Sequence, residues 1–389
     1  MSYSFDTIIP REGTHAYKLE LREKVFGTAD VLPLWVADMD FAAPPEVFEA
    51  INRRAQHGIY GYTVRGEWFQ QAIAGWMQRR HNWGVPLDTI EYAPGVVSSM
   101  VMAVMAFTRP GDKVLIQTPV YPPFYSVVKE NGRQLVTNPL LETANGYVMD
   151  FNLLEKQLSD PDVKLFLFCH PHNPVGRVWT RPELEQLAAL CLRYDVLMVS
   201  DEIHSDLMLF GHRHIPLASL SDEVAQHTVT LNAASKTFNI AGFSTSYVII
   251  TNPELLATFR KSLTALHLYT GHVFSGIALQ AAYAHGEPWL AELLAYLEGN
   301  VMAVRDFVEA HLHGVTFHLP QATFLLWLNF KQWGLPQADL KDFIIRKSKV
   351  GLNDGVSFGP DGQGFMRLNV GAPRALVMEG LERIAAVMR

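Results

Sequence analysis

Short apolar segments and helix-like segments alternate between Ile90 and Thr251, and this alternation limits the possible folds more than any other feature. The apolar segments are rich in β-branched residues and nearly continuous in apolarity, which is typical of strands buried on both faces. Such an order predicts a mostly parallel sheet covered by helices. The expected strands are 90–93, 113–117, 134–137, 164–169, 196–200, 228–231 and 246–251, and the helices between them include 98–107, 124–130 and 181–193.

The rest of the chain has a different character. Long helical segments replace the alternation after residue 252, and a mixed region of strands and helices follows, closing with a helix over 375–388. A chain of 389 residues, of which 49% are hydrophobic, can bury a substantial core and usually divides into two domains. We therefore expect an α/β fold with a large domain, residues 45–290, that contains the seven-stranded sheet, and a smaller α+β domain formed by residues 1–44 and 291–389.

Composition excludes several classes of function. The net charge of −7 is spread through the chain without a basic stripe, which argues against nucleic acid as a ligand. The first thirty residues are rich in charge and no apolar stretch is long enough to span a bilayer, so we expect neither a secretory signal nor a membrane anchor. The two cysteines, Cys169 and Cys191, lie inside apolar runs, which favours a reducing compartment. We expect a cytoplasmic protein that acts on a small molecule.

Lys236 is the strongest candidate for a reactive group. It lies in a segment of small residues directly after the expected strand 228–231, and ligand crevices of α/β sheets lie at such strand ends. A lone lysine is usually solvated or paired, but between Asn232 and Ile250 the only other ionisable side chain is Tyr247. Desolvation lowers the pKa of an amine, which makes it available as a nucleophile, Schiff-base former or proton carrier.

Two further segments at strand ends carry weaker signals. The sequence from Ala93 to Ser99 reads as strand, glycine turn and helix, and backbone N–H groups at a helix start bind anions such as phosphate. Many glycine turns precede helices for steric reasons alone, so this signal is not specific. Tyr121 lies among prolines that stiffen the chain, and this stretch is equally compatible with a ring that stacks on a flat ligand and with one that fills the core.

A third candidate is Asn173, which follows the expected strand 164–169 in a turn that we expect to be rigid and exposed. Its amide either contacts a ligand or caps the turn. His170 and His172 lie in the same turn, but no other cysteine or histidine keeps ligand spacing with them, so we expect no metal site.

Asp201 emerges from a run of apolar residues, where an unpaired carboxylate is costly, and it therefore needs a cationic or protonated partner. His204 stands three residues later and is either a hydrogen-bond donor to this site or an ordinary structural histidine. Pyridoxal 5′-phosphate has a pyridine ring that a buried aspartate keeps protonated, an aldehyde that reacts with a lysine, and a phosphate that suits the glycine turn. Together these residues predict a site for pyridoxal 5′-phosphate.

Several motifs resemble a known family over nearly the whole chain. Tyr121, Asn173 in Asn-Pro-Val-Gly, Asp201 in Ser-Asp-Glu-Ile-His, Lys236 in Ser-Lys-Thr-Phe-Asn and Arg367 in Arg-Leu-Asn are similar to the motifs of fold-type I, aminotransferase-like enzymes. Within that group, the motifs at 34–41, 57–62, 201–204 and 235–239 resemble those of the MalY/PatB-type cystathionine β-lyases.

The resemblance implies a role for each matching residue. Lys236 would bind the cofactor's aldehyde and act as the base, and Asp201 would pair with the pyridine nitrogen. Asn173 and His204 would contact the cofactor, and Tyr121 would stack on its ring. Arg367 would bind the substrate α-carboxylate. The phosphate would be held by Gly95, Val96, Val97 and Ser235, and by Tyr62 from the neighbouring subunit of a homodimer. Two positions depart from the wider pattern, because Ser244 and Ala233 stand where many aminotransferases have an arginine and a serine.

The activity implied by the resemblance is cleavage of the carbon–sulfur bond of L-cystathionine, cysteine or an S-substituted cysteine to a thiol, pyruvate and ammonia. An aminotransferase is the alternative, since it would use the same lysine, aspartate and arginine and differ only in where the proton returns. A protein that keeps the cofactor but works by binding a partner is a third hypothesis.

Overall fold

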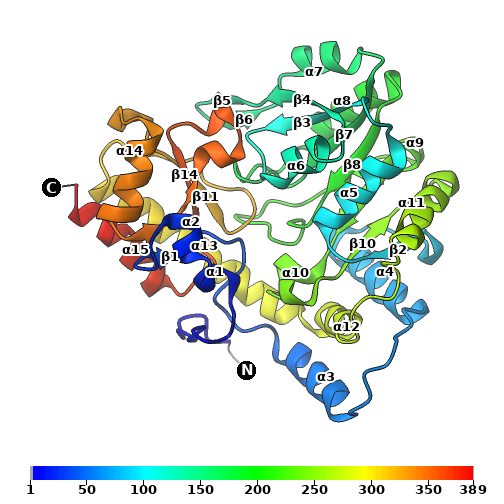
Figure 1. The fold of residues 1–389 in the computed structure, drawn as a ribbon, viewed down its shortest axis with the longest axis horizontal. Coiled ribbons are helices and arrows are strands. Elements are labelled where there is room, and N and C mark those ends of the chain that lie inside the picture. Colours follow the sequence, from blue (N-terminus) through cyan, green and yellow to red (C-terminus); the bar gives the residue numbers. More distant parts are fainter. Residues whose placement is uncertain (1–2, 389) are drawn as a thin grey trace.

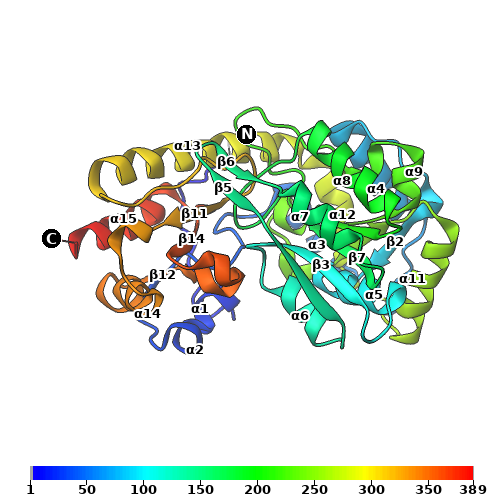
Figure 2. The same cartoon turned by 90° about the horizontal axis from the view of Figure 1, so that it is seen from above.

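The computed structural model describes residues 3–388, which form two parts that lie side by side (Figures 1 and 2). The larger part contains a central sheet with helices on both faces. The smaller part combines the N-terminal segment with the C-terminal elements, and the long helix α13 (Glu287–His311) runs from one part into the other (Figure 2). None of the described helices combines the length and the apolarity needed to cross a membrane.

The central sheet has the strand order β2–β10–β9–β8–β7–β3–β4. All neighbouring pairs are parallel except the two that involve β10, which runs antiparallel to β2 and to β9. The mostly parallel, seven-stranded sheet predicted from the sequence is therefore confirmed. Its strands are β2 (Ile90–Ala93), β3 (Lys113–Thr118), β4 (Gln134–Pro139), β7 (Val163–Cys169), β8 (Leu197–Asp201), β9 (Thr228–Asn232) and β10 (Ser246–Ile249).

Alternate residues of one strand are buried in opposite faces of this sheet. In β7, Leu165 and Leu167 belong to a hydrophobic cluster with α5, α6 and α11, whereas Phe166 and Phe168 belong to another with α7 and α8. Because both faces are covered, the strands are apolar almost without interruption. The helices of this part are α4 (Glu67–His81), α5 (Val96–Phe107), α6 (Pro123–Lys129), α7 (Phe151–Leu158), α8 (Arg181–Arg193), α9 (Asp222–Gln226), α10 (Ala234–Thr237), α11 (Pro253–Ala265) and α12 (Ser275–His285).

The smaller part contains a three-stranded antiparallel sheet of order β11–β14–β13. Strand β1 pairs with β12, which places segments from both ends of the sequence in this part. Helix α13 contacts both α12 and α15, so the proposed domain boundary at residue 290 falls inside one helix and stays a prediction. The smaller part contains α1 (Tyr17–Glu20), α2 (Arg22–Phe26), β1 (Leu32–Pro33), β11 (Leu325–Asn329), α14 (Gln337–Asp342), β12 (Val350–Gly351), β13 (Asn353–Asp354), β14 (Phe365–Asn369) and α15 (Arg374–Ala386). Residues 45–290 also contain α3 (Pro45–Gln56), β5 (Leu141–Thr143) and β6 (Gly146–Val148).

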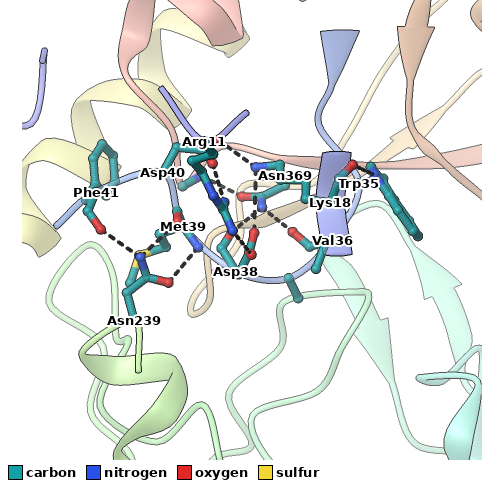
Figure 3. A network of polar contacts seen from close by, with 12 residues as sticks. Arg11, Lys18, Trp35, Val36, Asp38, Met39, Asp40, Phe41, Asn239 and Asn369 are labelled. Carbon is teal, nitrogen blue, oxygen red and sulfur yellow. Dashed lines mark hydrogen bonds and ion pairs between the residues drawn. The ribbon is translucent and has the colours of Figure 1, made fainter. Parts of the chain in front are cut away.

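Residues 35–41, which we call the bridging segment, connect the two parts without regular secondary structure (Figure 3). The Asn369 amide, at the end of β14, donates hydrogen bonds to the carbonyls of Val36 and Asp38, at 2.5 and 2.7 Å. The Asn239 amide, just after α10, donates to the carbonyls of Met39 and Phe41, at 2.8 and 2.7 Å. One end of the segment is thus held by the smaller part and the other by the larger part.

Asp206, in the loop after β8, joins two helices of the larger part. Its side chain, 1% exposed, accepts hydrogen bonds from Trp76 Nε1 at 3.2 Å and Thr237 Oγ1 at 2.8 Å, and it pairs with His81 Nε2 at 2.9 Å. Burial raises the pKa of Asp206, but the hydrogen bond and charge of His81, with the charge of Arg80 and the hydrogen bond from Thr237, hold the pKa below its ordinary value. This pairing links α4 to α10, the helix that carries Lys236.

We predict that Asp206→Asn lowers the free energy of unfolding by about 3 kcal/mol, because it breaks a buried charged network. Equilibrium unfolding in urea measures this. Since the folded pKa is depressed, the stabilisation should be present above pH ~4 and should be lost as the pH falls through the folded pKa. Asp160→Asn, which removes an exposed partner of Lys113, is the control and should change the urea midpoint much less. Equal effects of the two substitutions would contradict the prediction.

Candidate active site

A cavity of about 160 Å³ lies at the carboxyl edge of the central sheet. Residues after the carboxyl ends of several strands line it, as expected for a ligand crevice of an α/β sheet. Eight of the residues predicted from the sequence meet here, namely Val96, Val97, Tyr121, Asn173, Asp201, His204, Ser235 and Lys236. The other lining residues, which the sequence reasoning missed, are Ala37, Cys169, Ile203 and Ala241.

Asp201 is the last residue of β8 and is buried, with 6% of its area exposed. Its Oδ1 accepts a hydrogen bond from the Ile203 N–H at 3.1 Å. Burial raises the pKa of Asp201 from 3.8 to about 7, because the charged carboxylate has lost most of its hydration. A cationic group bound in the cavity would relieve this cost, since it would stabilise the ionised carboxylate.

Lys236 lies in α10, directly after β9, and its side chain enters the same cavity. The amine Nζ donates a hydrogen bond to the Ala37 carbonyl of the bridging segment at 2.7 Å. Burial lowers the pKa of Lys236 to about 8, and the positive charge of Arg367 acts in the same direction. About a tenth of the amine is therefore neutral at pH 7 and able to act as a nucleophile or a base.

Arg367, in the middle of β14, approaches the cavity from the smaller part and is 3% exposed. It does not line the cavity itself. Its guanidinium donates to the side-chain oxygens of Asn173 at 3.1 Å and Asn353 at 2.7 Å, and to the Trp35 carbonyl at 3.0 Å. All three acceptors are neutral, and Nε has no partner among the described residues. Burial lowers the pKa of Arg367 to about 10, so it stays charged at neutral pH and can attract a carboxylate.

His204 and Tyr121 complete the polar lining. Burial lowers the pKa of His204 to about 3, with the charges of Lys236 and Arg367 as further causes, so this imidazole is neutral. Its Nδ1 has no hydrogen-bond partner among residues 3–388. Burial raises the pKa of Tyr121, whose backbone N–H donates to the Asn173 carbonyl at 3.2 Å. Both side chains thus present uncharged polar groups to a ligand.

The turn from Cys169 to Gly176 corrects one sequence-based expectation, because it is buried rather than exposed. His170 and His172 are fully covered, and Asn173 is 5% exposed. Both parts cover it: Phe168 and Trp179 of the larger part pack against the two histidine rings, and Gln321 of the smaller part donates its N–H to the Gly176 carbonyl at 2.8 Å. His170 Nε2 contacts the Ile215 carbonyl and His172 Nε2 the Pro119 carbonyl, and residues 3–388 contain no group of three potential metal ligands.

Four other positions named in the sequence analysis lie outside the cavity lining, two of them expected phosphate contacts and two of them departures from the wider family pattern. Gly95 is the N-cap of α5 and precedes Val96 and Val97, whose N–H groups stand in the first helical turn, where they lack intrahelical acceptors. Ser244 is exposed and Ala233 is buried, and neither lines the cavity. Tyr62 is 99% exposed and lies outside the cavity of its own chain.

Three of the four missed lining residues gave no signal for the same reason. Ala37 contributes its backbone carbonyl, and Ile203 and Ala241 contribute apolar area, so none of these three carries a side chain that signals chemistry. Cys169 carries a thiol, but its place inside an apolar run indicated a core residue. Ala37 stood in one of the motifs on which the resemblance was based, and that motif was the available signal. Asn353, which holds Arg367, gave no signal because β13 is only two residues long.

Comparison with known proteins agrees with this geometry. The family described as aminotransferase class I and II matches residues 29–384. The chain belongs to this family. The family's cystathionine β-lyase PatB from Bacillus subtilis (strain 168) is 48% identical over 385 residues, which cover 99% of this chain and 100% of PatB. The resemblance to MalY/PatB-type proteins is therefore confirmed.

Two solved structures are also similar to this chain. A PLP-bound putative aminotransferase from Clostridium difficile 630 has a TM-score of 0.98 and 40% identity, with 100% of both chains covered. A PLP-bound C–S lyase from Staphylococcus hominis has a TM-score of 0.91 and 34% identity, covering 99% of this chain and 98% of the other. PLP, pyridoxal 5′-phosphate, is thus present in both neighbours.

We predict that cofactor-free protein captures added pyridoxal 5′-phosphate at a rate set by the neutral fraction of Lys236. Since the pKa is lowered to about 8, the rate should level off above pH 8 and fall by about tenfold per pH unit below it. Stopped-flow absorbance between pH 6 and 10 measures this. Lys236→Ala should show no covalent capture, and a wild-type rate that keeps rising to pH 10 would contradict the assignment.

Proposed function

We propose that the protein is a pyridoxal 5′-phosphate-dependent carbon–sulfur β-lyase that cleaves L-cystathionine or another S-substituted cysteine. The observation that carries this proposal is the meeting of Lys236, Asp201 and Asn173 in the lining of one cavity, with Arg367 hydrogen-bonded to Asn173 behind that lining. The 48% identity to a cystathionine β-lyase over the full length supports carbon–sulfur cleavage rather than amino-group transfer.

The cavity fits the cofactor on three observations. Asp201 is a buried carboxylate whose raised pKa calls for a cationic partner, which a protonated pyridine nitrogen provides. Lys236 has the lowered pKa that an amine needs to react with an aldehyde. The first turn of α5, with Val96 and Val97 in the lining, suits a phosphate, and the Ser235 hydroxyl lies in the same lining.

The remaining cofactor contacts follow from the lining. Asn173 and His204 would contact the ring substituents, and Tyr121 would stack on the ring. When bound, pyridoxal 5′-phosphate supplies an electron sink for the charge that develops at the substrate Cα. Asp201 maintains that sink by keeping the ring nitrogen protonated.

The chain's own residues carry the other steps. Arg367 binds the substrate α-carboxylate through its guanidinium, which orients the Cα–H bond. Lys236 Nζ accepts the proton from Cα as the general base. The Cβ–S bond then breaks and the sulfur leaves as a thiolate with the bonding electron pair. Water hydrolyses the three-carbon fragment that remains to pyruvate and ammonia.

We propose further that the protein is a homodimer in which Tyr62 reaches the phosphate of the neighbouring subunit. Helix α3 and the loop after it extend from the body of the molecule (Figure 1) and expose several large apolar side chains. These are Phe48, Ile59, Tyr60, Tyr62 and Val64. Exposed apolar groups gathered on one segment favour a subunit interface. A cytoplasmic location accords with the two free cysteines, Cys169 and Cys191.

We predict that the loaded enzyme releases thiol and pyruvate from L-cystathionine in equal amounts without a keto-acid acceptor. Lys236→Ala should lower kcat by at least roughly a thousandfold, because it removes both the covalent anchor and the base. Coupled assays for pyruvate and free thiol measure the products. Lys261→Ala, an exposed lysine of α11, is the matched control and should leave kcat unchanged.

Two outcomes would overturn the lyase proposal. Turnover that depends on an added keto acid would identify an aminotransferase. If Lys236→Ala abolishes turnover but leaves the cellular phenotype of the wild-type gene intact, the protein acts through a binding partner instead.

The role of Tyr62 can be tested by mixing two inactive variants, Tyr62→Ala and Lys236→Ala. A mixed dimer contains one complete site, made from Lys236 of one chain and Tyr62 of the other. Random reassociation should therefore restore about a quarter of the wild-type activity at low cofactor concentration. Activity that stays at the level of the separate variants would contradict a shared site.

A further inference from the structure

A second cavity, of about 320 Å³, adjoins the one that contains Lys236. Ala241 lines both cavities. The bridging segment separates them, since Ala37 lines the first and Asp38 lines the second. A substrate whose Cα lies beside Lys236 would reach the second cavity by passing Ala241, the wall residue that the two cavities share.

The second cavity contains charges of both signs (Figure 3). Arg11 donates through Nη2 to Asp38 Oδ2 at 2.7 Å and through Nη1 to Asp40 Oδ1 at 2.6 Å. Lys18 Nζ donates to the other oxygen of Asp40, Oδ2, at 2.6 Å. The Lys18 side chain is 1% exposed and that of Arg11 is 25% exposed, so Arg11 is the cation that faces the cavity.

The charges of this cluster balance, because two cations face two carboxylates. A ligand that adds only one charge would upset this balance, whereas a ligand with one ammonium and one carboxylate would preserve it. Arg11 has five N–H donors and uses two of them on the carboxylates, so it keeps donors for a further carboxylate. Asp38 and Asp40 remain partly exposed, at 17% and 14%, and can accept from an ammonium.

The other walls of the second cavity are largely apolar. Ile9, Met39, Phe41 and Ala42 lie beside the charged cluster. They suit the methylene groups that separate a sulfur atom from a distant charged end. A short uncharged S-alkyl group would contact such walls but would leave the exposed charges of Arg11 and Asp38 without a ligand partner.

We propose that this cavity binds the distal α-amino acid group of the substrate, with Arg11 on its carboxylate and Asp38 and Asp40 around its ammonium. The inference rests on the proposed lyase function and deepens it, because it specifies the leaving group. The preferred leaving thiol carries its own ammonium and carboxylate, as the homocysteine half of L-cystathionine does.

The test compares kcat/KM for L-cystathionine with kcat/KM for S-methyl-L-cysteine, which lacks the distal charges. Arg11→Gln should lower the value for L-cystathionine about tenfold, the loss expected for a partly exposed charged hydrogen bond, and should change that for S-methyl-L-cysteine by less than about twofold. Asp38→Asn should act in the same direction. Asp38 also influences the pKa of Lys236, and any change in Lys236 affects both substrates. The decisive quantity is therefore the ratio of kcat/KM for L-cystathionine to kcat/KM for S-methyl-L-cysteine.

Arg260→Gln is the matched control, because Arg260 pairs with Glu91 at 2.6 Å on the surface, away from both cavities. It should leave the ratio unchanged. Arg11→Lys keeps a cation between the carboxylates but loses the planar fork, and it should lower the value for L-cystathionine less than Arg11→Gln does. This variant serves as the test if Arg11→Gln does not fold, as judged by its circular dichroism.

A second measurement does not depend on turnover. In the cofactor-loaded Lys236→Ala protein, calorimetry should show that Arg11→Gln weakens the binding of L-cystathionine about tenfold and leaves S-methyl-L-cysteine binding unchanged. Equal losses for both ligands, or an unchanged ratio, would overturn the distal site. Failure of the wild-type enzyme to release pyruvate from either substrate would instead overturn the proposed lyase function, so the two failures are distinguishable.

Discussion

Desolvated charge is concentrated at the carboxyl edge of the central sheet, and the surrounding elements have to offset its cost. Asp201, Lys236 and Arg367 are all held where water cannot fully solvate them, and burial shifts each pKa toward the neutral form. An uncompensated buried charge lowers stability, so such a cluster persists only where a ligand or a function compensates for it. The cofactor and the substrate together would bring a cation for Asp201 and an anion for Arg367.

The free-energy cost of burying these charged groups is offset by hydrogen bonds and apolar packing in the surrounding helices and strands. Asp206 connects α4 to the helix of Lys236 with hydrogen bonds from Trp76 and Thr237. Both faces of the sheet are covered by helices and contribute burial of apolar area. Asp201 ends β8, Lys236 lies on the short helix α10 and Arg367 lies in the middle of β14, so regular elements fix them rather than long loops.

Much of this arrangement could be predicted from the sequence, because its signals are local. The strands of a sheet covered on both faces are continuous apolar runs, and β2 and α8 begin and end where the pattern predicts. Helix α5 begins two residues earlier than predicted, since Gly95 is its N-cap. The burial of the turn at Asn173 could not be predicted, because it depends on residues far away in the sequence, among them Ile215 in the larger part and Gln321 and Arg367 in the smaller part. Backbone groups such as the Ala37 carbonyl give no signal in side-chain chemistry.

The bridging segment explains why the two parts act on one substrate. Lys236 from the larger part and Arg367 from the smaller part both donate hydrogen bonds to it, at Ala37 and Trp35. The asparagines that brace the segment, Asn239 and Asn369, stand three and two residues after these reactive side chains. Within the described part of the chain, Arg367 keeps Nε–H and one Nη1–H free for a carboxylate while its Nη2 holds the Trp35 carbonyl. One short segment thus fixes the group that attracts the substrate carboxylate and, two residues further on, the carbonyl that holds the Lys236 amine.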